Sequence, residues 1–231
     1  MTTLTDQDLQ KRAAATEAVR RVRDGMTLGL GTGSTAAWFV TLLGERIRDG
    51  LCVRGVPTSE ATAALARECG VEILGLEQVS RIDLCVDGVD EVDGSCRAIK
   101  GGGGALLREK IVASAADQVV CIADASKRVQ TLGAFPLPVE VIPFAVSLVQ
   151  RRIADLGCSP VLRRTADGKP FRSDENNLIL DCPFGRIDDP ETLAAELAFI
   201  PGVVEHGLFL GLIDEMLFAG GDGVRSLPAA A

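Results

Sequence analysis

The sequence predicts an α/β protein: a Rossmann-like parallel sheet with helices on both faces, together with a smaller α+β domain. Two observations lead to this prediction. Short apolar runs alternate with helical patterns through the first half of the chain, as is typical of parallel sheets. From about Gly133 the pattern changes, because the proline-rich segment Phe135-Pro136-Leu137-Pro138 is followed by strands and helices in another order. We therefore expect a main domain over 1–132 and 205–231 and a smaller domain over 133–204.

The elements of the main domain follow from apolar runs and helix caps. The runs predict buried strands at Met26–Leu30, Leu51–Val56, Val71–Leu74, Ile82–Val86 and Val119–Ile122. Helical patterns fall at Gln7–Arg23, Ser34–Ile47, Ser59–Cys69 and Ala105–Ala115. Thr58 or Ser59 suits the start of the third helix and Gly70 its end.

The smaller domain has its own expected elements. A strand should run to Ile142, and further strands and helices should lie at Phe144–Leu156 (helix), Val161–Arg164 (strand), Asn177–Cys182 (strand) and Pro190–Phe199 (helix). The apolar tail, Val203–Leu212 and Glu215–Phe218, is expected to return to the main sheet.

Composition restricts the compartment and the partners. The chain has 231 residues, 47% of them hydrophobic, and no apolar run approaches the roughly 20 residues that span a bilayer. Residues 1–23 lack the apolar core of a signal peptide, so we expect a cytoplasmic protein without membrane contact. The net charge of −8 argues against a nucleic-acid partner, which would require a basic surface. The seven cysteines never occur as C-x-x-C, which favours buried reduced thiols over disulfides or a metal site.

The segment Lys100-Gly101-Gly102-Gly103-Gly104 indicates the chemistry most specifically. Each glycine disfavours helix by about 1 kcal/mol relative to alanine, but bare N–H groups suit a loop that closes around an anion at a helix N-terminus. The helical repeat places Glu109 on the small, apolar side of the following helix. A partly desolvated carboxylate has a raised pKa and suits a general base. The alternative is that Glu109 only pairs with Arg108 or a lysine and anchors the helix.

The loop Gly29-Leu30-Gly31-Thr32-Gly33-Ser34-Thr35 follows the first strand and begins a helix, where ligands of parallel sheets bind. Its glycines begin like a dinucleotide fingerprint, but Ser34 stands at the third glycine position, and no acidic residue follows a second strand about 20 residues on. A nucleotide P-loop motif is also absent here. Hydroxyls and N–H groups at a helix start favour a compact phosphate. The alternative is a tight turn in which Ser34 or Thr35 caps the helix.

Carboxylates and lysines supply the other candidate residues. Asp87-Gly88-Val89-Asp90 follows a predicted strand, and its two carboxylates suit sugar hydroxyls better than a metal, because the spacing does not fit a calcium loop. Asp93-Gly94 suits a hairpin turn. Lys127 follows another strand at the same sheet edge. The only histidine, His206, lies in an apolar segment and is expected to be structural, so acid–base work must fall to carboxylates and lysines.

In this order along the chain, the motifs resemble the ribose-5-phosphate isomerase family of type A. The resemblance spans nearly the whole sequence, through Gly29–Thr35, Asp87–Glu91, Lys100–Lys110, Ser126-Lys127, Phe135–Val141 and Ile200–Phe209. It implies an aldose-ketose isomerase that interconverts ribose 5-phosphate and ribulose 5-phosphate through an enediolate, in the non-oxidative pentose phosphate pathway. It also implies that no metal or organic cofactor takes part and that the chain forms a homodimer or a dimer of dimers.

The resemblance implies roles for individual residues as well. Glu109 would be the base that moves a proton between C2 and C1, and Lys100 with the following glycine N–H groups would stabilise the oxyanion. Asp87 and Asp90 would hold hydroxyls and assist ring opening. Substrate contacts are further implied for Thr32, Gly33, Ser34, Thr35, Gly88, Val89, Gly101, Gly102, Gly103 and Lys127. Which loop binds the phosphate and which the reacting carbons stays open.

The chain departs from the family pattern at two places, and related folds offer alternatives. Ser173–Asn177 stands where the family usually has Asp-Asn-Gly-Asn, and Ala125 where Glu or Ser is usual; neither segment is assigned to catalysis. A sugar-phosphate-sensing regulator would need a DNA-binding module, for which the roughly 25 residues before the first strand are too few. Coenzyme A transferases and amino-sugar phosphate deaminases remain the alternatives among enzymes.

Overall fold

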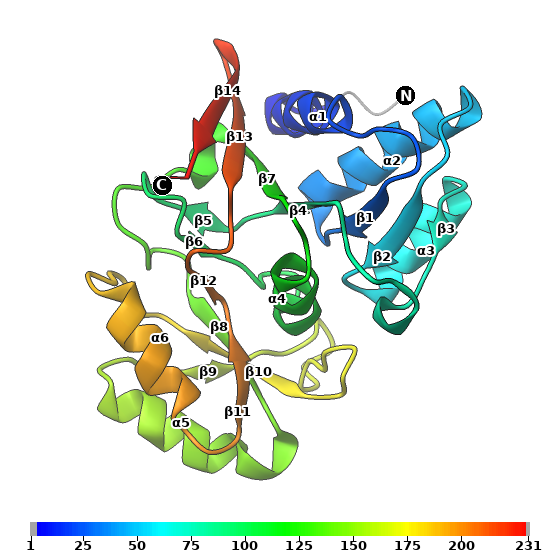
Figure 1. Cartoon of the computed structure of the whole chain (residues 1–231). Coiled ribbons are helices and arrows are strands. Elements are labelled where there is room, and N and C mark those ends of the chain that lie inside the picture. The colour runs from blue at the N-terminus through cyan, green and yellow to red at the C-terminus, as the bar shows by residue number, and fades with distance from the viewer. Residues whose placement is uncertain (1–3, 230–231) are drawn as a thin grey trace.

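The computed structural model describes residues 4–229, and its largest element is a seven-stranded sheet (Figure 1). The strand order is β14-β13-β7-β4-β1-β2-β3, and every neighbouring pair is parallel except the edge hairpin of β13 and β14. Its strands are β1 (Thr27–Leu30), β2 (Arg54–Pro57), β3 (Glu72–Ile73), β4 (Leu84–Gly88), β7 (Val119–Asp124), β13 (Glu215–Gly220) and β14 (Gly223–Pro228).

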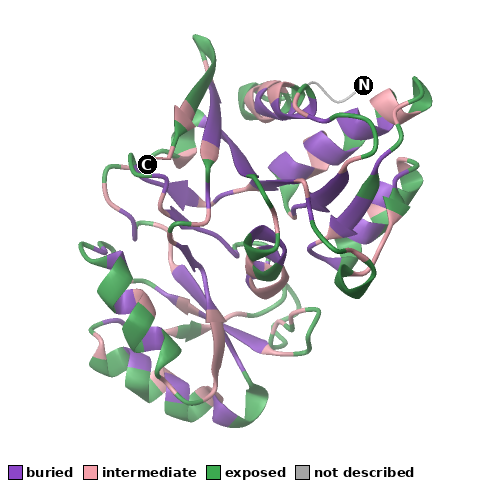
Figure 2. Cartoon of the chain, viewed as in Figure 1, coloured by how far each residue is buried: buried purple, intermediate pink, exposed green. Residues whose placement is uncertain are grey.

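Helices cover both faces of this sheet, as predicted. The four helices of this part are α1 (Asp6–Val19), α2 (Ser34–Arg48), α3 (Glu60–Glu68) and α4 (Leu106–Ser114). Side chains of α1 and α2 share one core cluster with Leu28 and Leu30 of β1, whereas Val112 of α4 packs with Cys85 and Cys121 on the opposite face. Residues of the same strands contribute to both core clusters because successive strand residues point to opposite faces of the sheet. Figure 2 shows the buried residues along the strands and on the helix faces that meet them.

Two smaller sheets complete the fold. An antiparallel sheet has the order β11-β8-β10-β9, formed by β11 (Val203–His206), β8 (Leu137–Val141), β10 (Leu178–Cys182) and β9 (Val161–Leu162). It packs against α5 (Val146–Asp155) and α6 (Pro190–Ala198). Between it and the large sheet lies a three-stranded sheet of β12 (Leu208–Phe209), β6 (Ala98–Ile99) and β5 (Glu91–Val92) (Figure 1). Single 3-10 turns occur at η1 (Leu76–Gln78), η2 (Ala125–Lys127) and η3 (Pro143–Ala145).

Most predicted elements are confirmed, with ends that shift by a few residues. The Ser59 hydroxyl accepts a hydrogen bond from Thr62 N and caps α3, and Gly70 follows the end of that helix at φ +85°. The turn predicted at Asp93-Gly94 joins β5 to β6. The seven cysteines are free, and five of them are buried. Among residues 4–229, no helix is long and apolar enough to cross a membrane.

The expectation for the tail from Val203 is wrong in part. Of the segments named in that expectation, the one in β13 joins the main sheet, parallel to β7, while β11 pairs with β8 of the small antiparallel sheet and β12 pairs with β6. An apolar run predicts a strand but does not show which other strand it pairs with. Here β11 pairs with the edge of β8 that β10 leaves free. Strand β14 was not expected, because its residues are mostly exposed and form no apolar run. The division into two domains stays a prediction.

Candidate active site

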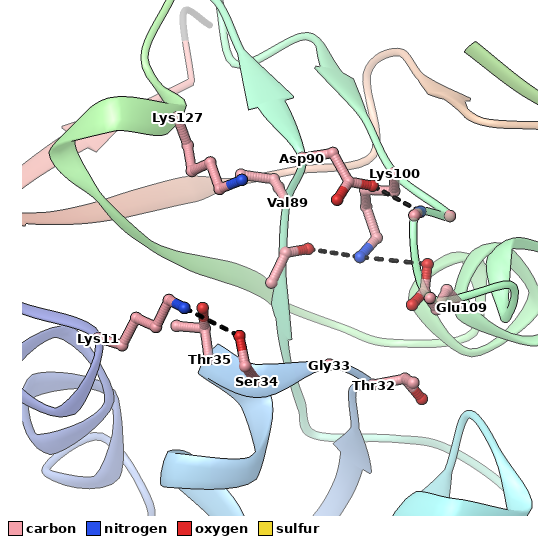
Figure 3. A pocket seen from close by; sticks show the side chains of 14 residues that line it. Lys11, Thr32, Gly33, Ser34, Thr35, Val89, Asp90, Lys100, Glu109 and Lys127 are labelled. Carbon is pink, nitrogen blue, oxygen red and sulfur yellow. Dashed lines mark hydrogen bonds and ion pairs between the residues drawn. The ribbon is translucent and has the colours of Figure 1, made fainter. Parts of the chain in front are cut away.

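A pocket opens at the carboxyl ends of β1 and β4, between the start of α2 and the glycine loop before α4 (Figure 3). It is lined by Lys11, Thr32, Gly33, Ser34, Thr35, Gly88, Val89, Asp90, Lys100, Gly101, Gly102, Gly103, Glu109 and Lys127. Every candidate residue from the sequence lies in this lining except Asp87. Lys11 of α1 is an addition that the sequence reasoning missed.

Lys100 lies at the bottom of the pocket, 3% exposed, at the end of β6. Its ammonium group donates to the carbonyl of Gly88 and forms ion pairs with Asp87 (Nζ–Oδ2 3.0 Å) and Glu109 (Nζ–Oε2 3.4 Å). It also lies over the ring of Phe209, 5.3 Å from the centroid. Burial by itself would lower the pKa of Lys100, but the two carboxylates outweigh burial and raise it above its usual value. Lys100 is therefore a fixed positive charge beside the pocket.

Glu109 lies in the first turn of α4 and is only 3% exposed, as its place on the apolar side of the helix predicts. Burial raises the pKa of Glu109 to about 8, and the negative charges of Asp87 and Asp90 act in the same direction against the attraction of Lys100. A carboxylate with a pKa near neutrality can both take up and release a proton. Of the alternative partners, Arg108 pairs instead with Glu60 (2.9 Å) and Glu175 (2.6 Å), and the lysine that pairs with Glu109 is Lys100.

Asp87 stands behind Lys100 rather than in the pocket lining. The carboxylate is 2% exposed, and its Oδ1 atom accepts hydrogen bonds from Thr32 N (3.1 Å) and Gly88 N (2.7 Å). Burial raises the pKa of Asp87, although Lys100 and these N–H groups favour the carboxylate. A Cβ at Gly31 would collide with Asp87, so a glycine is required where β1 passes this side chain. The position of Asp87 suits support of Lys100 more than contact with a ligand.

The glycine loop presents its backbone to the same region. Gly101 and Gly104 have φ of +99° and +85°, which favours glycine at both positions. The N–H of Gly102 donates to Asp90 Oδ2 (2.7 Å), which brings the Asp90 carboxylate to the rim of the loop. The loop thus places N–H groups within the lining formed by Lys100 and Glu109.

The opposite side of the pocket is formed by the start of α2. Lys11 Nζ donates to Ser34 Oγ (3.0 Å), and Figure 3 shows Lys11, Ser34 and Thr35 across the pocket from Lys100 and Glu109. Within residues 4–229 no side chain caps α2, so the N–H groups of its first turn are available to an anion. Lys127 of η2 adds a third lysine to the lining, after Lys11 and Lys100. This side combines positive charge, hydroxyls and N–H groups.

His206 does not line the pocket. It is 7% exposed, its Nδ1 atom accepts from Leu208 N (3.3 Å), and burial with the nearby Lys110 ammonium lowers the pKa of His206 to about 4. The side chain is therefore neutral at physiological pH. In the part of the chain that the structure describes, no three His, Cys, Asp or Glu side chains come together as a metal-binding group.

A buried carboxylate, a lysine and backbone N–H groups in one pocket suit an enzyme that moves protons on a small anionic substrate, and the comparisons give the family. The chain matches the family model of Ribose 5-phosphate isomerase A (phosphoriboisomerase A) over residues 54–223. Ribose-5-phosphate isomerase A of Parvibaculum lavamentivorans is 55% identical over 211 residues, 89% of this chain and 91% of the relative. The protein of the same name from Rhodopseudomonas palustris (strain TIE-1) is 52% identical over 97% of this chain and 100% of its own length.

Solved structures agree with the sequence relatives. Ribose 5-phosphate isomerase A from Methanocaldococcus jannaschii has a TM-score of 0.91 at 41% identity, covering 94% of this chain and 97% of its own. A D-ribose-5-phosphate isomerase in complex with phospho-erythronic acid has a TM-score of 0.94 at 39% identity, covering 97% and 100%. The chain belongs to the ribose 5-phosphate isomerase A family and is an isomerase, which confirms the resemblance found in its motifs.

Proposed function

We propose that this pocket interconverts ribose 5-phosphate and ribulose 5-phosphate, with the reacting carbons beside Glu109 and Lys100 and the phosphate at the start of α2. The observation that carries the proposal is the buried pair of Lys100 and Glu109, 3.4 Å apart, in the lining of one pocket with Gly101, Gly102 and Gly103. The motifs left the orientation of the substrate open, and the difference in chemistry between the two sides of the pocket supports this one.

The proton transfer falls to Glu109. In the open-chain aldose, the carboxylate takes the proton from C2, and the C–H electrons form the C1–C2 double bond while charge moves to O1. The resulting enediolate becomes the ketose when Glu109 returns its proton to C1 and the O2 proton moves to O1. A pKa of about 8 supports this role, since the group then gives and takes a proton at little cost in free energy.

The charge that develops on O1 needs donors that are already in place. Lys100 is fixed by Asp87 and Gly88, and the glycine N–H groups beside it belong to a loop with defined backbone angles. Preorganised donors of this kind lower a barrier by roughly 3–4 kcal/mol each in other enzymes. Asp90, at the rim, is the carboxylate suited to hold a sugar hydroxyl and to assist ring opening, and Asp87 acts by holding Lys100.

The phosphate is assigned to the side formed by Lys11, Ser34 and Thr35, with Lys127 and the N–H groups of Gly33 and the first turn of α2. A helix N-terminus favours negative charge, and Lys11 adds a cation 3.0 Å from the Ser34 hydroxyl. Binding at this end holds the sugar while the other end reacts, so it contributes mainly to substrate affinity and orientation.

We further propose that the enzyme works in the cytoplasm as a homodimer or a dimer of dimers. The support for self-association is an exposed apolar region around η3 and the end of α6, where Phe144 and Phe199 are 98% and 86% exposed. These two segments are adjacent, since Ile142 N donates to Gly202 O (3.0 Å). Sedimentation of the wild type beside a Phe144→Ser, Phe199→Ser double variant tests whether this region joins two copies; an unchanged mass would exclude it.

The experiment that tests the reaction is a coupled isomerase assay in EDTA on ribose 5-phosphate beside other phosphorylated aldoses. We expect turnover of ribose 5-phosphate, incorporation of solvent deuterium at the migrating carbon, and loss of turnover in Glu109→Gln with substrate binding retained. Near-full activity of that variant would overturn the assignment of the base. Absence of turnover by the wild type would overturn the proposed function itself.

A further inference from the structure

The outer side of the glycine loop is held by an arginine from the small antiparallel sheet. Arg163, which follows β9, donates from Nη1 to the carbonyl of Gly101 (2.9 Å) and to that of Gly102 (3.1 Å). Arg163 is not part of the pocket lining. A single guanidinium group therefore fixes two successive peptide units of the loop from outside the site.

The orientation of those carbonyls determines where the N–H groups point. In a trans peptide unit, C=O and N–H point in opposite directions, so the Gly101 carbonyl is paired with the N–H of Gly102, and the Gly102 carbonyl with that of Gly103. With both carbonyls turned to Arg163, the two N–H groups face the opposite side. Gly102 N accordingly donates to Asp90 Oδ2 (2.7 Å) at the pocket, and Gly103 lies in the lining.

The guanidinium group of Arg163 is itself fixed by a carboxylate and an aromatic ring. Asp181 of β10 accepts from both Nε (3.0 Å) and Nη2 of the guanidinium, and the Phe171 ring centroid lies 5.8 Å from Arg163 Cζ. The Arg163 side chain is 13% exposed. The Phe171 ring also closes against Gly104, where a Cβ atom would collide with it. Bidentate pairing with a carboxylate gives the planar guanidinium one orientation, which a lysine could not reproduce.

We propose that Arg163, oriented by Asp181, is a positioning residue for the isomerisation: it aims and polarises the N–H group of Gly103 at the oxyanion of the enediolate, and it holds the N–H group of Gly102 on Asp90. The inference rests on the proposed role of the glycine loop. A positive charge on the carbonyl oxygens makes the N–H groups of the same peptide units stronger donors. The small antiparallel sheet thereby takes part in the reaction without touching the substrate.

The test is Arg163→Ala, with Arg164→Ala as the matched control. Arg164 is the next residue, is exposed, and its side chain donates to Gly168 O (2.7 Å) in its own loop. Removing a direct oxyanion donor lowers kcat by roughly 100- to 1,000-fold in other enzymes. Because Arg163 acts through the peptide units, we expect kcat to fall about 10- to 100-fold, with KM changed less than about threefold. Arg164→Ala should match the wild type.

Two further readouts separate positioning from a structural effect. Inhibition by phospho-erythronic acid, whose carboxylate would lie at the enediolate position, should weaken in Arg163→Ala, whereas inhibition by inorganic phosphate should not change. Added guanidinium ion should restore part of the lost kcat in Arg163→Ala alone, and an equal concentration of sodium chloride should not. If Arg163→Ala does not fold, Arg163→Lys and Asp181→Asn replace it. In these variants too we expect kcat to fall while KM changes little.

The proposal fails if the Arg163 variants keep the kcat of the wild type, or if KM for substrate and inhibition by inorganic phosphate change as much as kcat does. It also fails if guanidinium restores nothing while the fold is intact. A failure of the proposed function is distinguishable, because then the wild type and Arg164→Ala would also lack isomerase activity.

Discussion

Replacing Glu109 by glutamine should stabilise the protein at alkaline pH while it removes the catalytic base. Glutamine has the shape of a protonated glutamate, so the variant imitates the neutral form of the side chain at every pH. The folded protein favours that neutral form, because burial raises the pKa of Glu109 from 4.5 to about 8. The wild type should therefore lose stability, relative to the variant, as pH rises between these two values.

Proton linkage gives the sign and the size of the difference in unfolding free energy between the wild type and Glu109→Gln. Below pH 4.5 the carboxyl group is protonated in both the folded and the unfolded chain, and the two proteins should be equally stable. Above that value the unfolded wild type releases the proton first, so its stability falls by up to about 1.4 kcal/mol per pH unit until the folded group ionises. The rise to about 8 sets a ceiling of about 5 kcal/mol. Water entry and side-chain movement reduce it, and we expect about 2 kcal/mol at pH 9.

The assay is urea unfolding of the wild type and Glu109→Gln at pH 5, 7 and 9, followed by circular dichroism. Glu196→Gln, a change at an exposed glutamate of α6, is the control and should follow the wild type at each pH. The difference in unfolding free energy between wild type and Glu109→Gln should be smallest at pH 5 and largest at pH 9. An equal difference at all three values, or a wild type that is the more stable protein at pH 9, would refute the reasoning.

Three other predictions concern activity. The kcat/KM of the wild type should rise with pH and level off above about 8, because Glu109 must be ionised to take the proton; a flat profile from pH 6.5 to 9 would contradict this. Lys11→Met should raise KM about tenfold and leave kcat within about twofold in initial-rate measurements, as expected for about 1.4 kcal/mol of phosphate binding; an equal loss in kcat would place the phosphate elsewhere. Gly102→Ala puts a Cβ atom 2.5 Å from Asp90 Oδ1, so kcat should fall at least tenfold, whereas Gly94→Ala, with no atom within 4 Å of its Cβ, should be silent.

Local physics made much of the site predictable from the sequence. The helical repeat alone places Glu109 among apolar neighbours, and the structure buries it there. Strand ends of a parallel sheet meet at one edge, so loops that are far apart in the sequence, at Thr32, Gly88 and Lys127, line one pocket. Each inference needed only the periodicity of one element and the direction of its neighbours.

The remaining residues around the site, Lys11 and Arg163, are placed by the packing of one element on another. A single sequence does not show which elements pack together. Lys11 reaches the pocket because α1 packs on α2. A signal was present, since Lys11 lies three, four and seven residues before the buried Ala14, Ala15 and Ala18, and so on the inner face of α1. The contact of Arg163 with the glycine loop could not be predicted either. It depends on the register in which the short strand β9 pairs with β10, and the sequence does not give that register.

A backbone hydrogen bond from Lys100 N to Gly207 O (2.9 Å) connects the lysine of the pocket to a segment more than one hundred residues later in the chain. Gly207 passes so close to the Lys100 carbonyl that a Cβ atom there would collide with it. During synthesis, the residues of the pocket lining, which end at Lys127, leave the ribosome well before their support exists. Contacts of such long sequence separation form late in folding. A nascent or truncated chain that stops before Gly207 therefore carries every pocket-lining residue but lacks this support of Lys100, and we expect activity only once the chain extends past Gly207.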